Sequence, residues 1–339
     1  MKRASWMILL LLCGGCAGSL LIKMRPQASG ADLLEAELRG RLEADVRALA
    51  MPRSTQFPEG YAHAAAFIRE TLASQGYVVS GEPVPYIGPT TTREAHPNGV
   101  TLVRTVVAPG IAENLVAELP GETDEIVVLG AHYDAYGGVP GADDNASGVA
   151  AMLEVSRRLA GRRLHRTVRF YAWANEEPPY FQRAGMGSPV SAALARARGD
   201  RLSAVLVLDA VGVYSDAPGS QDYPAPFGLL FPDRADFVAV VGNPRSARLV
   251  DHVTTLLREA GSLKVSGAAV PALVTGVDWS DHWSFWQEGY PSVLLTDMPP
   301  FRNEHYHERT DTPDTLDYDQ LARFAAALAV AVEALATSP

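Results

Sequence analysis

Carboxylates and a histidine recur where predicted strands end, and these residue types can bind a cation. Each of five candidates closely follows an apolar run that is typical of a strand covered on both faces. They are His132, Asp134, Glu176, Glu177 and Asp209. In a sheet whose strands alternate with helices, ligands bind outside the carboxyl ends of the strands. We therefore expect these side chains to share one crevice.

Two further carboxylates, Asp143 and Asp144, stand between a Gly-rich loop and the predicted start of a helix. Taken singly, the candidates have ordinary interpretations, since an Asp pair can cap a helix and a Glu pair can be solvated. Taken together, six carboxylates facing one crevice would raise each other's pKa and destabilise the fold unless cations lay between them. No Lys or Arg stands beside them in the sequence, so metal ions are the economical explanation.

The residue types narrow the choice of metal. The only cysteines are Cys13 and Cys16, so the rest of the chain has no disulfide and no thiolate site. Imidazole with carboxylate oxygen suits zinc, and manganese or cobalt are possible. Two divalent ions would balance three ligating carboxylates and a hydroxide. That balance favours a two-metal hydrolase, in which a metal-bound water attacks a polarised carbonyl and one glutamate takes the water's proton.

The elements that must position these residues alternate along the chain. We expect helices at 31–49, 61–75, 148–161, 188–198, 246–260 and 318–336, and a short helix or turn at 281–289. We expect strands at 77–84, 101–107, 113–119, 126–129, 167–174, 202–208, 237–241 and 292–296. Residues 85–98 and 299–315 read as loops, and 215–235 as a long surface loop that could cover the site. This order predicts an α/β fold with a mostly parallel or mixed central sheet and helices on both faces.

Composition and the N-terminal segment restrict the possible partners and the cellular location of the protein. The chain has 339 residues and a formal net charge of -10, so we expect no nucleic-acid partner. Residues 4–22 form an apolar stretch behind Lys2 and Arg3. The stretch is typical of a retained membrane anchor, a cleaved signal peptide or a lipoprotein signal at Cys16. Each alternative predicts an exported, periplasmic or otherwise extracytoplasmic protein. We expect residues 1–25 to be this segment and 26–339 to be a single domain, with its core at 113–335.

Six motifs in a fixed order carry a family resemblance. They are GAHYD at 130–134, GADDNASG at 141–148, NEE at 175–177, the strand ending in Asp209, SDHWSF at 280–285 and YHERTDTPDTL at 306–316. Together they resemble the M28 family of zinc aminopeptidases, over about residues 113–335. The resemblance implies a phosphorylase/hydrolase-like zinc exopeptidase fold, two Zn²⁺ ions, and peptide substrates with a free N-terminus.

The resemblance also implies roles for particular residues. His132 and Asp209 would bind one zinc, Glu177 and His307 would bind the other, and Asp144 would bridge the two. Glu176 would be the general base and later the proton donor. Asp134 would orient the imidazole of His132. Asp281 and His282 look like a further supporting pair.

The sequence also departs from the family pattern. Family members commonly have a short Gly-Leu loop after the two glutamates, whereas Pro178, Pro179, Tyr180 and Phe181 stand here, so substrate preference does not carry over. No tyrosine can be assigned the role of polarising the carbonyl. Two alternatives stay open: a glutaminyl cyclase that uses a single zinc on the same fold, and a catalytically inactive binding or scaffold domain. The complete set of ligand positions disfavours both.

Overall fold

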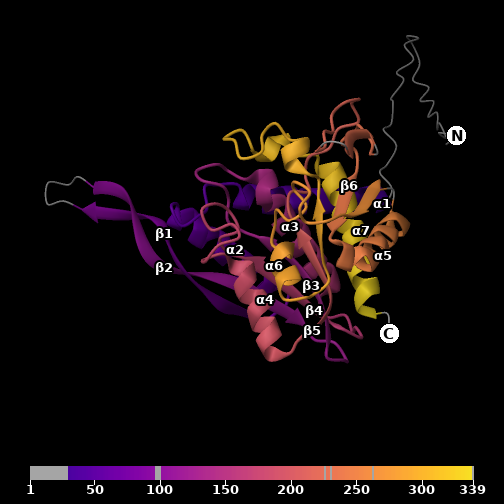
Figure 1. Cartoon of the computed structure of the whole chain (residues 1–339), viewed down its shortest axis with the longest axis horizontal. Helices are drawn as coiled ribbons and strands as arrows, with labels where there is room; N and C mark the ends of the chain where they lie inside the picture. The colour runs from indigo at the N-terminus through magenta and orange to yellow at the C-terminus, as the bar shows by residue number, and fades with distance from the viewer. Residues whose placement is uncertain (1–29, 96–100, 225–226, 230, 262, 338–339) are drawn as a thin grey trace, which may run out of the picture.

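One mixed sheet of eight strands forms the centre of the molecule (Figure 1). The computed structural model describes residues 30–95, 101–224, 227–229, 231–261 and 263–337. The predicted anchor or signal segment, residues 1–25, lies outside these described residues. The strands follow the order β1-β2-β4-β3-β5-β8-β6-β7 across the sheet. Their bounds are β1 Val79–Ala95, β2 Thr101–Leu119, β3 Glu125–His132, β4 Thr167–Trp173, β5 Arg201–Leu208, β6 Val238–Gly242, β7 Val265–Ala269 and β8 Ser292–Thr296.

The sheet is parallel at its centre and antiparallel towards its edges. β3 pairs in parallel with β4 and β5, and β5 pairs in parallel with β8. β1 and β2 are antiparallel to each other, β2 is antiparallel to β4, and β6 is antiparallel to β8. The predicted mixed α/β sheet is therefore confirmed. Its central strands end side by side, at the edge where the candidate residues follow them.

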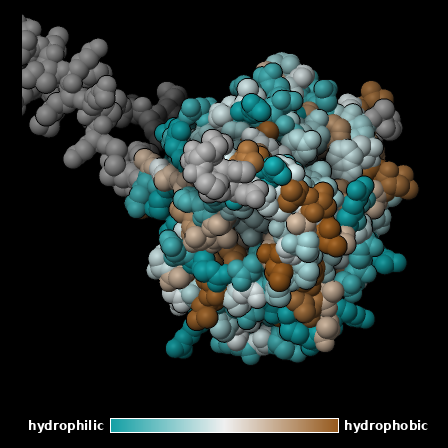
Figure 2. All heavy atoms as spheres, turned by 90° about the vertical axis from the view of Figure 1, so that its left-hand side faces the viewer, coloured by the Kyte–Doolittle hydropathy of each residue, from teal (hydrophilic) through white to brown (hydrophobic). Residues whose placement is uncertain are grey.

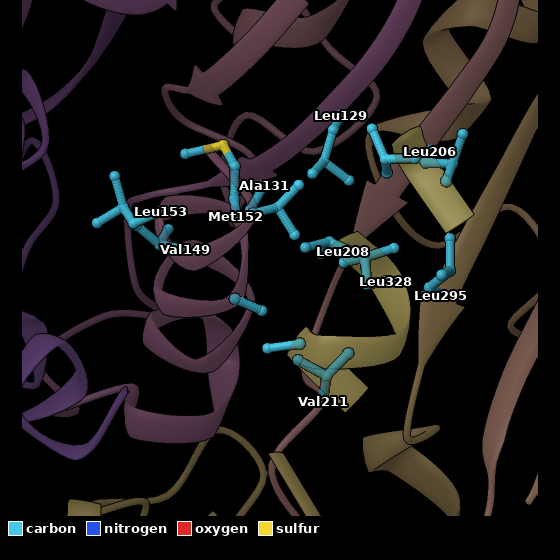
Figure 3. Close-up of a cluster of buried hydrophobic side chains, with 14 of the residues drawn as sticks. Leu129, Ala131, Val149, Met152, Leu153, Leu206, Leu208, Val211, Leu295 and Leu328 are labelled. Atoms are coloured by element: carbon cyan, nitrogen blue, oxygen red, sulfur yellow. The ribbon is translucent and has the colours of Figure 1, made fainter. Parts of the chain in front are cut away.

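Helices cover both faces of the sheet. Their bounds are α1 Gly30–Leu49, α2 Pro58–Ser74, α3 Gly148–Leu159, α4 Gly187–Arg198, α5 Ala247–Ala260, α6 His282–Gln287 and α7 Tyr318–Thr337. Alternate residues of a strand face opposite sides, so Leu206 of β5 packs in one core with α1, α2, α3, α5 and α7. Its neighbour Val205 packs in a second core with α4 and α6. Figure 3 shows part of the first core, with Leu206, Leu208 and Leu295 from the sheet near Leu328 of α7.

The region before β3 differs from the expectation. The loop expected at 85–98 is wrong, because β1 runs on to Ala95, and the two strands expected at 101–107 and 113–119 are one strand, β2. Together they form a long hairpin that extends from the body (Figure 1). The proline, glycine and threonine content of 85–98 favours a loop, but β1 is an edge strand, where the missing N–H of a proline is tolerated. Figure 2 faces the end of this hairpin and shows apolar patches scattered among polar ones.

β7 was also not expected from the sequence. It is a short strand at the other edge of the sheet and pairs only with β6. Its sequence, VSGAA, has no long apolar run that would indicate a strand. Gly267 in its middle lies against Thr254 of α5, so closely that a Cβ atom there would clash with the threonine hydroxyl. Small residues at this edge therefore serve close packing of α5, which a pattern of apolar residues does not reveal.

Within the described part of the chain, α7 is the one helix that is long and apolar enough to cross a membrane. However, 61% of its most apolar window is buried inside the molecule. Leu321, Phe324 and Leu328 belong to the first core, packed with the sheet. The apolar character of α7 is thus explained by its place in the core.

Candidate metal centre

The candidate residues come together at the carboxyl end of the central strands. His132 is the last residue of β3, Asp209 directly follows β5, and Glu176 and Glu177 follow β4. These three strands are neighbours in the sheet, in the order β4-β3-β5. Asp144 lies in the irregular turn Ala142–Ser147 just before α3. These side chains lie close together, as expected.

Two groups of potential metal donors share Asp144. In the first group, Nε2 of His132 lies 3.2 Å from Oδ1 of Asp144 and 3.4 Å from Oδ1 of Asp209. In the second, Nε2 of His307 lies 3.2 Å from Oδ2 of Asp144 and 3.2 Å from Oε2 of Glu177. Each group has its donor atoms within 4.8 Å of one another. The two oxygens of Asp144 therefore face different groups.

These spacings fit divalent ions. Donors about 2.0–2.2 Å from a tetrahedral ion lie roughly 3.3–3.6 Å from each other, close to the four distances above. Several polar atoms of these residues also have no hydrogen-bond partner among the described residues, although they are buried. They are Oδ1 of Asp144, Oε1 of Glu177 and Nε2 of His307. Buried polar atoms normally find partners, so this donor set is suited to two cations.

Glu176 belongs to neither donor group. Its Oε2 lies 4.0 Å from Nε2 of His132, and the residue is buried. Asp134 holds the turn that presents both glutamates: its Oδ1 accepts the backbone N–H of Glu176 at 3.0 Å, and its Oδ2 accepts that of Glu177 at 3.1 Å. Oδ1 of Asp134 also lies 3.5 Å from Nδ1 of His132. Asp134 thus touches the histidine, as expected, and additionally supports the glutamate turn.

Asp144 is supported by carboxylates to which sequence reasoning assigned no role. Asp311 accepts the backbone N–H groups of Asp143 and Asp144, at 2.8 and 3.2 Å. Asp143 in turn accepts hydrogen bonds from the backbone of Gly212 and from Nδ2 of Asn303, at 2.9 and 2.8 Å. Asp143 therefore joins loops behind the donor groups and supplies no donor to them. Asp311 lies inside the motif 306–316, which was the only signal for it.

His307 is held between two tyrosine rings. Tyr136 stacks on the imidazole with ring centroids 4.0 Å apart and an interplanar angle of 4°. Tyr306 also stacks on it, with ring centroids 3.9 Å apart and an interplanar angle of 20°. His307 has a φ of 60°, a conformation that is uncommon for a residue other than glycine. Stacking on both tyrosines fixes the ring direction in this unusual backbone. Tyr136 and Tyr306 were not singled out from the sequence, because stacking leaves no motif.

The centre is buried and anionic, and pKa shifts follow from this. Burial raises the pKa of Glu176 well above its ordinary value. For Glu177, burial and, as the next largest cause, the negative charge of Asp144 raise the pKa to about 8. Burial alone would lower the pKa of His132, but the carboxylates of Asp209 and Glu176 raise it well above its usual range. For His307 burial acts the same way, yet the nearby carboxylates of Asp144 and Glu177 raise its pKa to about 10. The carboxylates thus attract positive charge from every side.

A buried arginine, Arg53, also faces these carboxylates, and sequence reasoning missed it. It is 1% exposed and stands in the segment after α1, far from the candidates along the chain. Its guanidinium interacts favourably with the negative charge of Asp144 and, next in strength, with that of Asp134. No Lys or Arg stands beside the carboxylates in the sequence, but in the structure Arg53 interacts with them electrostatically without forming an ion pair among the described residues.

The predicted supporting pair, Asp281 and His282, is fully buried at the start of α6. Nε2 of His282 lies 2.8 Å from the carbonyl oxygen of Val277, and its own carbonyl accepts the hydroxyl of Ser292. These bonds tie α6 to the loop before it and to β8. Within the described residues neither carboxylate oxygen of Asp281 has a hydrogen-bond partner, and burial raises the pKa of Asp281 to about 7.

An apolar pocket adjoins the donor groups. Asp209 and Tyr306 line the side of the pocket next to the centre, and among the described lining residues Asp209 is the charged one. Its aromatic walls are Tyr223, Phe227, Phe231, Phe237, Trp279 and Phe301. Three of them come from the loop expected at 215–235, which therefore covers the pocket. The pocket opens to solvent at its mouth.

Comparison with known proteins was made by sequence and by structure. The model of Peptidase family M28 matches residues 114–332. The uncharacterized protein YfbL of Escherichia coli (strain K12) is 35% identical over 295 residues, which cover 84% of each chain. Probable leucine aminopeptidase 1 of Trichophyton verrucosum (strain HKI 0517) is 29% identical over 230 residues, 62% of this chain and 55% of the relative. This chain thus spans about half the length of that relative.

Solved structures share the fold at low sequence identity. BSAP, a zinc aminopeptidase from Bacillus subtilis, has a TM-score of 0.65 and 15% identity, with 88% of this chain and 95% of the other covered. The glutaminyl cyclase of Fimbriiglobus ruber has a TM-score of 0.60 and 17% identity, with 87% and 94% covered. The same fold therefore occurs in proteins of two different activities.

Proposed function

Because this chain belongs to peptidase family M28, we propose that it is a metal-dependent aminopeptidase that removes N-terminal residues from peptides. The observation that carries the proposal is the pair of donor groups that share Asp144, with the uncommitted carboxylate of Glu176 beside them. The relative named as a probable leucine aminopeptidase supports the choice of reaction.

The proposed cofactor is a pair of zinc ions, with manganese or cobalt as possible substitutes. His132 and Asp209 would hold one ion, Glu177 and His307 the other, and Asp144 would bridge them. Two ions bound there would supply Lewis-acid activation of the scissile carbonyl and of the attacking water. The mixed nitrogen and oxygen donors suit zinc, and the unpartnered donor atoms support two ions.

The chain's own residues then have separate tasks. A carboxylate oxygen of Glu176 takes a proton from the attacking water and returns it to the amine of the leaving peptide. Asp134 keeps the carboxylate in place through the backbone N–H of Glu176. The carboxylates of the centre attract the positively charged N-terminus of the substrate, which is why a free amino group is required.

The neighbouring pocket supports a preference for large apolar N-terminal residues. Asp209 lies at the boundary of pocket and centre, so a substrate whose amino group is near Asp209 places its first side chain in the pocket. Burying a leucine-sized side chain contributes about 1.5–3 kcal/mol, which corresponds to roughly 10–150-fold in kcat/KM relative to glycine.

Hydrolysis of a peptide panel tests the proposal. We expect release of free Leu or Phe from unblocked peptides with added zinc, slower release of Gly, and none from N-acetylated peptides. Conversion of N-terminal Gln into a ring, without hydrolysis, would instead establish the glutaminyl cyclase alternative. A chain that neither hydrolyses nor cyclises any peptide after zinc is added would leave the binding or scaffold alternative.

We also propose that the protein works outside the cytoplasm, in the periplasm or an equivalent compartment. Residues 4–22 would direct export and, if uncleaved, would anchor the chain in the membrane. Fractionation of cells producing the full chain tests this. Recovery of the chain with membranes or in the periplasm is expected, and recovery in the cytoplasm alone would contradict it.

A further inference from the structure

Arg53 carries a buried positive charge close to the candidate metal centre. It lies outside residues 114–332, the range that the family model matches. Among the described residues no carboxylate lies within ion-pair distance of its guanidinium, although the side chain is fully buried. Burying a charge is costly unless hydrogen bonds compensate, so its partners need to be identified.

Among the described residues, the hydrogen-bond partners of the Arg53 guanidinium are backbone carbonyls. Two belong to its own neighbourhood, Leu49 and Met51, and three belong to the loop 133–141 between β3 and α3. The guanidinium donates to the carbonyl oxygens of Tyr133 at 2.8 Å, Gly141 at 2.7 Å, Leu49 at 3.0 Å, Met51 at 3.3 Å, and Pro140. The carbonyl of Arg53 itself accepts the N–H of Ala135 at 2.9 Å. Arg53 thus binds both ends of this loop at once.

The loop 133–141 carries residues that touch the donor groups from both sides. Asp134, at its beginning, contacts His132 and holds the turn of the two glutamates. Tyr136, further along, stacks on His307. Asp144 follows three residues after the loop ends. The shape of the loop therefore bears on both groups of donors.

Gly141 shows how closely the guanidinium and the loop fit. Its φ is 60°, in the left-handed region that favours glycine. A Cβ atom added there would clash with the carbonyl oxygen of Asp144 and would lie 3.2 Å from Nη1 of Arg53. The end of the loop is thus held against Asp144 on one side and Arg53 on the other.

We propose that Arg53 is a positioning residue of the metal centre, which holds loop 133–141 in the shape that directs His132 and His307 towards bound ions. This inference rests on the proposed function, because it assumes that the donor groups bind divalent ions. It also implies that the N-terminal part of the chain, which lies before the residues that the family model matches, contributes to the metal centre.

If Arg53 acts through its charge, removing the guanidinium should strengthen zinc binding. If it acts by positioning the loop, removing it should weaken zinc binding. A nearby positive charge repels a divalent cation, so the loss of that charge alone would strengthen zinc binding. Loss of the hydrogen bonds would free the loop and weaken zinc binding, and outer partners of metal ligands typically contribute 10–100-fold in affinity. Lysine keeps the charge but not the planar fork of donors, and methionine keeps neither. The two substitutions therefore separate the effects.

Zinc titration of the full-length chain against a competing chelator tests the proposal. Wild type, Arg53→Lys and Arg53→Met would be compared, with the exposed Arg104→Met as matched control. We expect both substitutions of Arg53 to weaken zinc binding by about 10–100-fold, and Arg104→Met to leave it unchanged. Unfolding temperature is measured in parallel, because a merely structural role would lower it without changing the zinc Kd of the folded chain.

Each contrary outcome is distinct. Wild-type affinity in Arg53→Lys with tighter binding in Arg53→Met would overturn positioning and leave only a charge effect. If the Arg53 variants do not fold, Tyr136→Leu tests the same loop at a residue that is 37% exposed. We then expect one of the two ions to bind more weakly, and unchanged binding of both would refute the role of the loop. A wild-type chain that binds no zinc would overturn the proposed function itself.

Discussion

Two adjacent glutamates take different positions after β4. Oε2 of Glu177 lies 3.2 Å from Nε2 of His307 and faces the shared Asp144, whereas Glu176 belongs to neither donor group. Both are buried, and both have backbone N–H groups held by Asp134. Under the proposed function, this difference separates a residue that binds an ion, Glu177, from one that exchanges protons, Glu176.

Substitution of Glu176 by Gln tests this separation. Gln keeps the shape of Glu176 but cannot take a proton, so we predict a loss of roughly two to four orders of magnitude in kcat with the metal content unchanged. Exposed Glu122→Gln is the control. Peptide hydrolysis and metal content would be measured on the same samples. A near-wild-type rate in Glu176→Gln would show that another group is the base.

His282 allows a prediction about pH and stability. Burial lowers the pKa of this histidine to about 4, whereas an unfolded chain has a value of about 6.5. Between these values the unfolded state binds a proton that the folded state does not, so stability contributed by neutral His282 is lost as pH falls from 6.5 towards 4. By pH 4.5 the loss amounts to about 2.5 kcal/mol.

Denaturant unfolding of metal-free wild type and His282→Gln at pH 7.5 and 4.5 measures this effect. We expect the difference in unfolding free energy between the two chains to shift by about 2.5 kcal/mol in favour of the variant at the lower pH. Comparison of two chains removes the contribution of the buried carboxylates, which both share. The exposed His252→Gln should show no such shift, and a pH-independent difference for His282→Gln would refute the prediction.

The site residues found from the sequence differ in kind from those that were missed. His132, Asp144 and Asp209 follow strands or precede a helix, so the order of elements alone brings them together. Arg53 acts through backbone carbonyls, and Tyr136 acts by stacking. Such contacts depend on where distant segments meet in space, and they leave no motif in the sequence. The roles of the ligands and of Glu176 and Asp134 stay predictions.

At the scale of elements, the central strands hold the residues of the candidate metal centre in place. β4, β3 and β5 are buried on both faces, which keeps their carboxyl ends in a fixed relation. Their continuous apolar runs were recognisable in the sequence for the same reason. The long β1–β2 hairpin was not, because its prolines and threonines indicate a loop unless the strand is known to lie at an edge.

Substitution of Leu206 tests whether β5 is packed in the first core. The residue is fully buried in the first core, so Leu206→Ala should lower the unfolding free energy by about 2–5 kcal/mol. Val78→Ala, at a position 87% exposed, should change it by less than about 0.5 kcal/mol. Denaturant unfolding of both variants provides the comparison. Equal stability of Leu206→Ala and wild type would mean that β5 is not packed as described.

At the scale of the whole molecule, the segment before the family match packs into the same unit. Tyr61 of α2 donates a hydrogen bond to Oδ1 of Asn175, next to the two glutamates, at 2.8 Å. Leu42 of α1 and Ile68 of α2 belong to the core that includes β3 and β5. The division into a segment 1–25 and one domain 26–339 stays a prediction.

The central claim is that Asp144 joins two ion sites in one chain. Its most direct test is the number of divalent ions bound per chain, determined by elemental analysis of protein purified without chelator and reconstituted with zinc. We predict two ions per wild-type chain and a loss of both from Asp144→Ala, because each donor group includes one oxygen of Asp144. A wild-type value that stays at one after zinc is added, or is zero, would contradict the account.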